Sequence, residues 1–184
     1  MNLREVFISQ YLAALEMLKE TITRCPESIW NSPDDRMKFW NIAYHALFYT
    51  HLYLEDSEES FKPWHKHIHE YQFLGQVPWE PHRPPKIGSP YDRETVLEYL
   101  AFCQQVVGER ITKVNLEAES GFSWLPFTRL ELLIYTLRHL QQHTGELMER
   151  LGTRTVSYTH LRAHETPEHL VCRLMLEKKK KTNQ

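Results

Sequence analysis

The chain has 184 residues and a nearly balanced charge, with 22 Lys and Arg residues against 24 Asp and Glu residues and a formal net charge of −2. This length suits one domain built around a single core. The balance excludes the large positive field of a nucleic-acid-binding protein, and no apolar run approaches the ~20 residues of a membrane span. We therefore expect a soluble protein that binds neither nucleic acid nor a membrane.

The cysteines indicate a reducing compartment. Of the three, Cys172 lies in a C-terminal segment that is set apart below, and the other two, without a signal peptide, do not make up the disulfide framework of a small secreted domain. We expect Cys25 and Cys103 to be reduced core thiols in a cytoplasmic protein.

Two stretches of helical periodicity open the chain. From Leu3 the apolar residues recur at intervals of four and three as far as Ile22, which predicts a helix that ends before Pro26. Residues 38–55 are apolar almost all round, which predicts a second helix buried on most sides. The Ser-Pro-Asp segment at 32–34 has the composition of a cap with a first-turn proline, and we expect it to open this second helix.

Residues 56–90 break this periodicity with acidic residues, aromatic residues and six prolines. A connection of about 35 residues is far longer than usual, so we expect either a functional cover or a family-specific insertion. Short turns of helix are expected within it, because its aromatic side chains need a surface to pack on. These aromatic residues are Trp64, Tyr71, Phe73 and Trp79.

Two further helices are predicted in the second half of the chain. Asp92 is a cap for a helix whose apolar seam occupies residues 96–114, and leucines mark a last helix over residues 130–151. We expect this last helix to stop at Gly152. Four amphipathic helices without an alternating strand pattern favour an all-α four-helix bundle, with the long Pro/Trp-rich connection between the second and third helices.

Three histidines on two of these helices are the candidate functional residues. His139 and His143 are four residues apart, so both imidazoles project from one helix face, and His45 adds a third nitrogen from the second helix. Neutral imidazoles bind divalent transition metals, and three of them leave one or more coordination positions for water or substrate. Each histidine taken singly also fits a core residue hydrogen-bonded to a carbonyl or hydroxyl, but one ion would satisfy all three together.

Other histidines offer alternatives to this set. His65, His67 and His69 alternate along the chain, so an extended segment would turn all three to one side and form a surface metal site. Their proline-rich setting favours a solvated loop instead. His51 lies about 240° round the helix from His45, and we do not expect the two to share a ligand sphere.

Glu146 follows His143 by three residues. It could accept a hydrogen bond from the imidazole, as the residues that orient metal ligands do. Pairing with Arg150, four residues further on, is the preferred interpretation.

A family resemblance rests on the second and last predicted helices, through the segments WNIAYHALFYTHLYL and RHLQQHTGELMERL. The chain resembles the DinB-like superfamily, whose four-helix bundles include the YfiT-like group and S-transferases that depend on low-molecular-weight thiols. The likeness covers roughly Leu3 to Gly152. It implies a divalent metal site, Zn²⁺ or Ni²⁺, with exchangeable water, and a homodimer formed through the bundle. The implied ligands are His45, His139 and His143.

The resemblance and the open coordination positions together suggest an enzyme. An ion held by three histidines would activate a low-molecular-weight thiol or water for attack on an electrophilic small-molecule substrate, as a metal-dependent S-transferase or a hydrolase. The thiol cofactor comes from the resemblance alone, and no residue is assigned a catalytic role. The alternatives are a non-catalytic metal-binding or stress-response bundle with a structural metal, and a metal-free bundle that serves dimer assembly.

The C-terminal segment from Val156 to Lys181 resembles a translated sequencing adapter. Its first part matches the transposase-end sequence with its primer extension, and its four final lysines fit a run of adenines. A natural basic amphipathic tail is the alternative. We therefore expect residues 1–155 to form the DinB-like bundle and residues 156–184 to be a poorly packed non-native tail, with the native chain truncated near Thr155.

Overall fold

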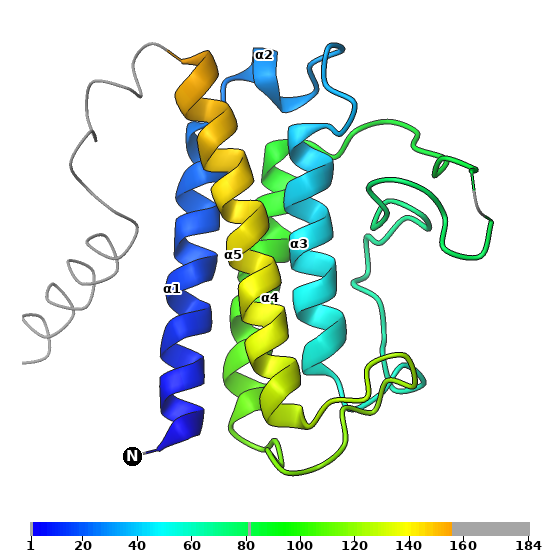
Figure 1. Cartoon of the computed structure of the whole chain (residues 1–184). Helices are drawn as coiled ribbons and strands as arrows, with labels where there is room; N and C mark the ends of the chain where they lie inside the picture. Colours follow the sequence, from blue (N-terminus) through cyan, green and yellow to red (C-terminus); the bar gives the residue numbers. More distant parts are fainter. Residues whose placement is uncertain (1, 81, 156–184) are drawn as a thin grey trace, which may run out of the picture. The chain divides into compact units, whose positions relative to one another are not determined.

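The structure is a computed structural model that describes residues 2–80 and 82–155 (Figure 1). These residues form five α-helices and no β-strand, which confirms the all-α prediction. The chain divides into two units after Met148, and the packing that positions the candidate site lies within the first. The helices are α1 (Leu3–Arg24), α2 (Glu27–Trp30), α3 (Phe39–Leu54), α4 (Arg93–Ile111) and α5 (Arg129–Arg154).

Among the described residues, no helix combines the length and the apolar character that crossing a membrane requires. The predicted tail at 156–184 lies outside the described residues, so its packing and the predicted domain boundary at 155 stay predictions.

Helix α1 ends where its sequence predicts. Cys25 leaves the helical conformation, with φ −66° and ψ 121°, because the ring of Pro26 excludes the α region for the residue before it. At the other end the side chain of Asn2 accepts a hydrogen bond from the Arg4 amide. The predicted stripe is buried along the helix, from Phe7 through Tyr11, Leu18 and Ile22.

Helix α3 begins later than the predicted cap. Its first helical residue is Phe39, and Lys38 at the cap position makes no side-chain cap hydrogen bond. The prediction that residues 32–34 open the helix is therefore wrong. Those residues form turns, and the Lys38 ammonium donates to the carbonyls of Ser32 and Asp35 at 2.8 Å each, which satisfies loop acceptors that a helix would have used internally.

The interior of the fold is built around α3 and α4. Of the 16 residues of α3, all except His45 and Tyr49 are buried, which confirms a helix covered on most sides. Helix α4 packs against both α1 and α3. It starts at the predicted cap, where Asp92 accepts from the Thr95 amide at 2.7 Å, and both Cys103 and Cys25 are buried.

Helix α5 differs from its prediction at one end. It continues through Gly152 to Arg154, so the expectation that Gly152 ends it is wrong. A glycine inside a helix costs only about 1 kcal/mol relative to alanine, which hydrogen bonding along the helix offsets. The predicted leucine seam is buried at Leu133, Leu140 and Leu147.

In its described residues, 55–80 and 82–92, the long connection between α3 and α4 contains hydrogen-bonded turns and no α-helix, so the predicted short turns of helix are absent from them. Its prolines remove backbone donors, and four-residue turns close instead, as where the His67 amide donates to the Trp64 carbonyl at 2.7 Å. The expected packing of aromatic side chains holds for Trp64, Tyr71 and Phe73, which are buried. Trp79 is 58 % exposed and contacts the Phe73 ring edge-on.

Candidate metal centre

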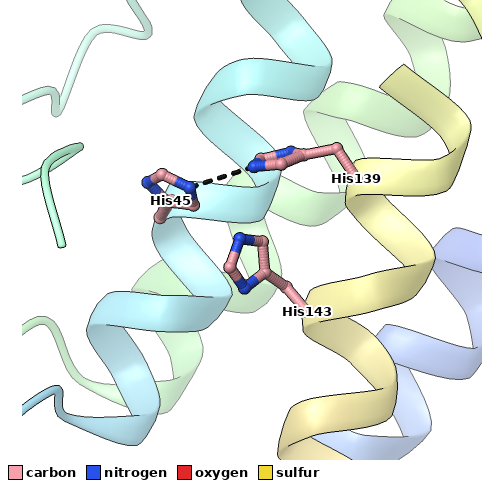
Figure 2. A group of neighbouring side chains, drawn as sticks. All are labelled: His45, His139 and His143. Carbon is pink, nitrogen blue, oxygen red and sulfur yellow. Dashed lines mark hydrogen bonds between the residues drawn. The ribbon is translucent and has the colours of Figure 1, made fainter. Parts of the chain in front are cut away.

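Helices α3 and α5 bring the three predicted histidines together. His45 projects from α3, and His139 and His143 project from successive turns of α5 toward it (Figure 2). Their ring centroids are 4.6 to 5.0 Å apart in all three pairs. The metal-binding atoms of the three residues all lie within 4.8 Å of one another. The local spacing on α5 and the packing of α5 beside α3 therefore produce one cluster.

The distances fit a transition-metal ion. Zn–N bonds of ~2.0–2.1 Å at a tetrahedral angle place two ligand nitrogens ~3.3 Å apart. The Nε2 atoms of His45 and His139 are 3.1 Å apart, close to that separation. The ligand atoms of the three residues, the third nitrogen included, all lie within 4.8 Å of one another.

Hydrogen bonds outside the cluster orient two of the rings. The Nδ1 atom of His45 is 2.6 Å from the Gln72 carbonyl, and Nδ1 of His143 is 3.1 Å from Oε2 of Glu146. A carbonyl or carboxylate oxygen only accepts, so each Nδ1 carries a ring proton, and in the neutral form of the imidazole the lone pair is on Nε2. Both rings therefore present a metal-binding nitrogen to the cluster, and Glu146 takes the role that the sequence left as the less favoured interpretation.

The ring of His139 is held differently. Its Nδ1 is buried and has no hydrogen-bond partner among the described residues. A buried polar atom left unpaired costs ~1–3 kcal/mol. The cluster thus contains a buried polar atom that no side chain among the described residues satisfies.

Burial keeps the rings of His45 and His139 neutral near pH 7. Burial lowers the pKa of His45 to about 3, with His143 and His139 acting in the same direction and the Gln72 carbonyl opposing. Burial also lowers the pKa of His139 to about 4, again helped by His143. Metal binding near neutral pH therefore displaces no proton from these two residues.

One side of the cluster is reachable from solvent. His143 is buried at 9 % exposure, whereas His45 and His139 are half-buried. The other half-buried residue of α3 is Tyr49, whose ring centroid is 4.7 Å from that of His45 and 5.7 Å from that of His139. A ligand at the cluster would thus approach along the surface that Tyr49 shares with these two rings.

The remaining histidines do not join this cluster. His51 is buried elsewhere, with Nδ1 3.1 Å from the Tyr99 hydroxyl. His67 Nδ1 lies 2.6 Å from the Tyr44 hydroxyl, His65 lies against Glu98, and His69 stacks on Trp79. These last three rings diverge, so the alternative surface site is wrong. Within residues 2–80 and 82–155, one group of three or more His, Cys, Asp or Glu residues is close enough to share a metal ion. It consists of His45, His139 and His143.

Two residues of the site were not predicted. Tyr49 follows His45 by one helical turn, and this spacing is a signal that the sequence offers. Gln72 contributes its backbone carbonyl, which every residue type possesses, so its side chain carries no such signal.

Comparisons of the chain with models of protein families, with curated proteins and with solved structures found no match.

Proposed function

We propose that the chain is a DinB-like four-helix bundle that binds one divalent transition-metal ion, Zn²⁺ or Ni²⁺, and uses it to activate a low-molecular-weight thiol or water against an electrophilic small molecule. The observation that carries the proposal is the convergence of three imidazoles from two helices within 4.8 Å. The ligands are His45, His139 and His143.

The bundle is supported by contacts among the four long helices. The Tyr11 hydroxyl of α1 donates to the Leu133 carbonyl of α5 at 2.7 Å, and α4 packs against α1 and α3. Helix α3 faces α5 across the histidines (Figure 2). Each long helix thus has two neighbours, as in a four-helix bundle in which the long connection lets α4 run parallel to α3 (Figure 1).

The number of ligands favours an exchangeable site over a structural one. Structural zinc sites in proteins are closed by four side chains, and catalytic sites keep three protein ligands and an open position. Within the part of the chain that the structure describes, the group has three members. Its exposed side, next to Tyr49, is where an exogenous ligand would enter.

The chemistry follows from that open position. A divalent ion there supplies a Lewis acid that lowers the pKa of a thiol or water, so that a strong nucleophile exists near neutral pH. Around it, Gln72 and Glu146 hold His45 and His143 in the tautomer that presents Nε2. Burial raises the pKa of Tyr49 to about 12, with Tyr53 and Tyr135 adding to the shift, so its phenol is a hydrogen-bond donor beside the site.

Metal analysis of the purified protein tests this assignment. We expect about one transition-metal ion per chain, with most of it lost in His139→Ala, because removing one of three ligands abolishes tight binding. His65→Ala is the matched control, since that side chain is 65 % exposed and lies outside the cluster. Equal metal content in wild type and His139→Ala would refute the site.

A second assay separates catalysis from a structural role. Consumption of low-molecular-weight thiols is followed in the presence of epoxides, alkyl halides and activated double bonds. Turnover that disappears in His139→Ala and persists in His65→Ala supports the transferase. An ion that is bound tightly, with neither thiol consumption nor hydrolysis in the wild type, supports the non-catalytic alternative.

A further inference from the structure

The side chain of Gln72 is an unexplained polar group beside the histidine cluster. Gln72 is 7 % exposed, and its amide oxygen Oε1 is buried without a hydrogen-bond partner among the described residues. An amide oxygen is a strong acceptor, and leaving it unpaired in the interior costs free energy. A buried acceptor of this kind indicates a donor that the polypeptide itself does not supply.

The backbone around Gln72 is held firmly on α3. The Gln72 carbonyl accepts from His45 Nδ1, and the preceding carbonyl, that of Tyr71, accepts from Asn41 Nδ2, both at 2.6 Å. Asn41 and His45 lie on successive turns of α3, so they bind two consecutive carbonyls. These bonds fix the backbone from which the Gln72 side chain starts, next to the imidazole of His45.

A second unpaired atom belongs to the same cluster. His139 Nδ1 is buried without a partner, and once Nε2 of this ring binds an ion, Nδ1 carries the ring proton and becomes a donor. The third such atom among the described residues is Nε of Arg93, whose guanidinium donates to the Cys25 carbonyl. Two of these three unpaired atoms thus belong to residues that contact His45.

We propose that Gln72 Oε1 accepts a hydrogen bond from the small molecule bound at the histidine cluster. The inference rests on the proposed metal site and narrows its ligand class. The preferred ligands carry an N–H or O–H donor within one or two bonds of the atom that binds the ion. Thiols and chelators with a nearby amide or hydroxyl belong to this class, and fully alkylated analogues do not.

A pair of matched probes tests this preference in the Co²⁺-loaded protein, whose visible absorption reports ligand binding. Acetohydroxamate and N-methylacetohydroxamate bind metals through the same two oxygens, and only the first has an N–H donor. We expect the wild type to prefer acetohydroxamate by about fivefold, the ratio that one net hydrogen bond provides.

The variants locate the acceptor. Gln72→Met keeps the length of the side chain and removes the acceptor, so it should bind both hydroxamates with equal affinity. Gln72→Glu keeps an acceptor oxygen and should keep the preference. The control is Gln76→Met in the same segment, because Gln76 is exposed and pairs with the His82 amide; it should behave as wild type.

Each contrary result has its own meaning. A preference that persists in Gln72→Met, or that is absent from the wild type, overturns the inference and leaves the metal site standing. Parallel weakening of both probes in Gln72→Met, with the ratio unchanged, also overturns it and reduces Gln72 to a support for His45. Failure of the wild type to bind Co²⁺ overturns the proposed function itself. Circular dichroism of each variant verifies folding, and the wild-type ratio remains decisive where a variant does not fold.

Discussion

Removing the Glu146 carboxylate should weaken metal binding without removing a ligand. Oε2 of Glu146 lies 3.1 Å from Nδ1 of His143 and keeps the proton on that nitrogen, which leaves Nε2 free for an ion. In Glu146→Ala this orientation is lost, although the imidazole remains. The experiment therefore separates the placement of His143 from its presence.

The structure sets the expected size of the effect. Loss of such an orienting partner typically costs 10–100-fold in metal affinity. The Glu146 side chain is 41 % exposed, so water can replace the lost carboxylate, and we expect the lower limit of about tenfold, or ~1.4 kcal/mol. Glu146→Gln retains a neutral acceptor with about half the strength of a charged one, so a loss of about threefold is expected.

Competition for Zn²⁺ between the protein and a colorimetric chelator at pH 7 measures these affinities. Gln142→Ala is the control, because Gln142 is an exposed residue of the same helix. The expected order is wild type and Gln142→Ala, then Glu146→Gln, then Glu146→Ala. Wild-type affinity in Glu146→Ala would refute the role of this carboxylate, and an equal loss in Gln142→Ala would show a general effect on α5.

Further predictions concern stability. Gly121 has φ +80°, and a Cβ there would lie 1.9 Å from the Asp56 carbonyl oxygen, so Gly121→Ala should lower the free energy of unfolding by ~3 kcal/mol in urea denaturation. Gly145→Ala, in an uncrowded helical position, should instead raise the free energy of unfolding by about 0.5–1 kcal/mol. A Gly121→Ala variant more stable than Gly145→Ala would refute both predictions. Hydrogen bonds from Arg83 and then Lys86 lower the pKa of Glu70 to about 2 from 4.5. Glu70→Gln should therefore lower the free energy of unfolding at pH 7. The difference from wild type should shrink as pH falls from 4.5 toward 2, and a difference that stays constant with pH would contradict this.

The helices could be predicted because their causes are local. The apolar stripe of α1, the proline that ends it and the aspartate that caps α4 act within a few residues, so the sequence alone reveals them. Where the prediction was wrong, another interaction at similarly short sequence distance decided the helix end. Lys38 binds loop carbonyls that a cap at 32–34 would have changed, and backbone hydrogen bonding carries α5 through Gly152.

One feature of the candidate site also follows from local sequence, and another depends on tertiary packing. The spacing of His139 and His143 on one helical face follows from the pitch of an α-helix and needs no tertiary information. Their proximity to His45 joins residues 94 positions apart, and it depends on how side chains pack between α3 and α5. The sequence could nominate His45 only through its apolar surroundings and the family resemblance.

What the sequence determined by itself is the set of helices and the identities of the imidazoles, because both follow from periodicity and residue chemistry over short distances. Only the tertiary structure decided which polar atoms surround them. The Gln72 carbonyl, the Glu146 carboxylate and the exposed side at Tyr49 take their places from packing, and packing depends on contacts between residues that are distant in the chain. The same long-range contacts leave Gln72 Oε1 and His139 Nδ1 without a hydrogen-bond partner within residues 2–80 and 82–155, a feature that no local pattern encodes.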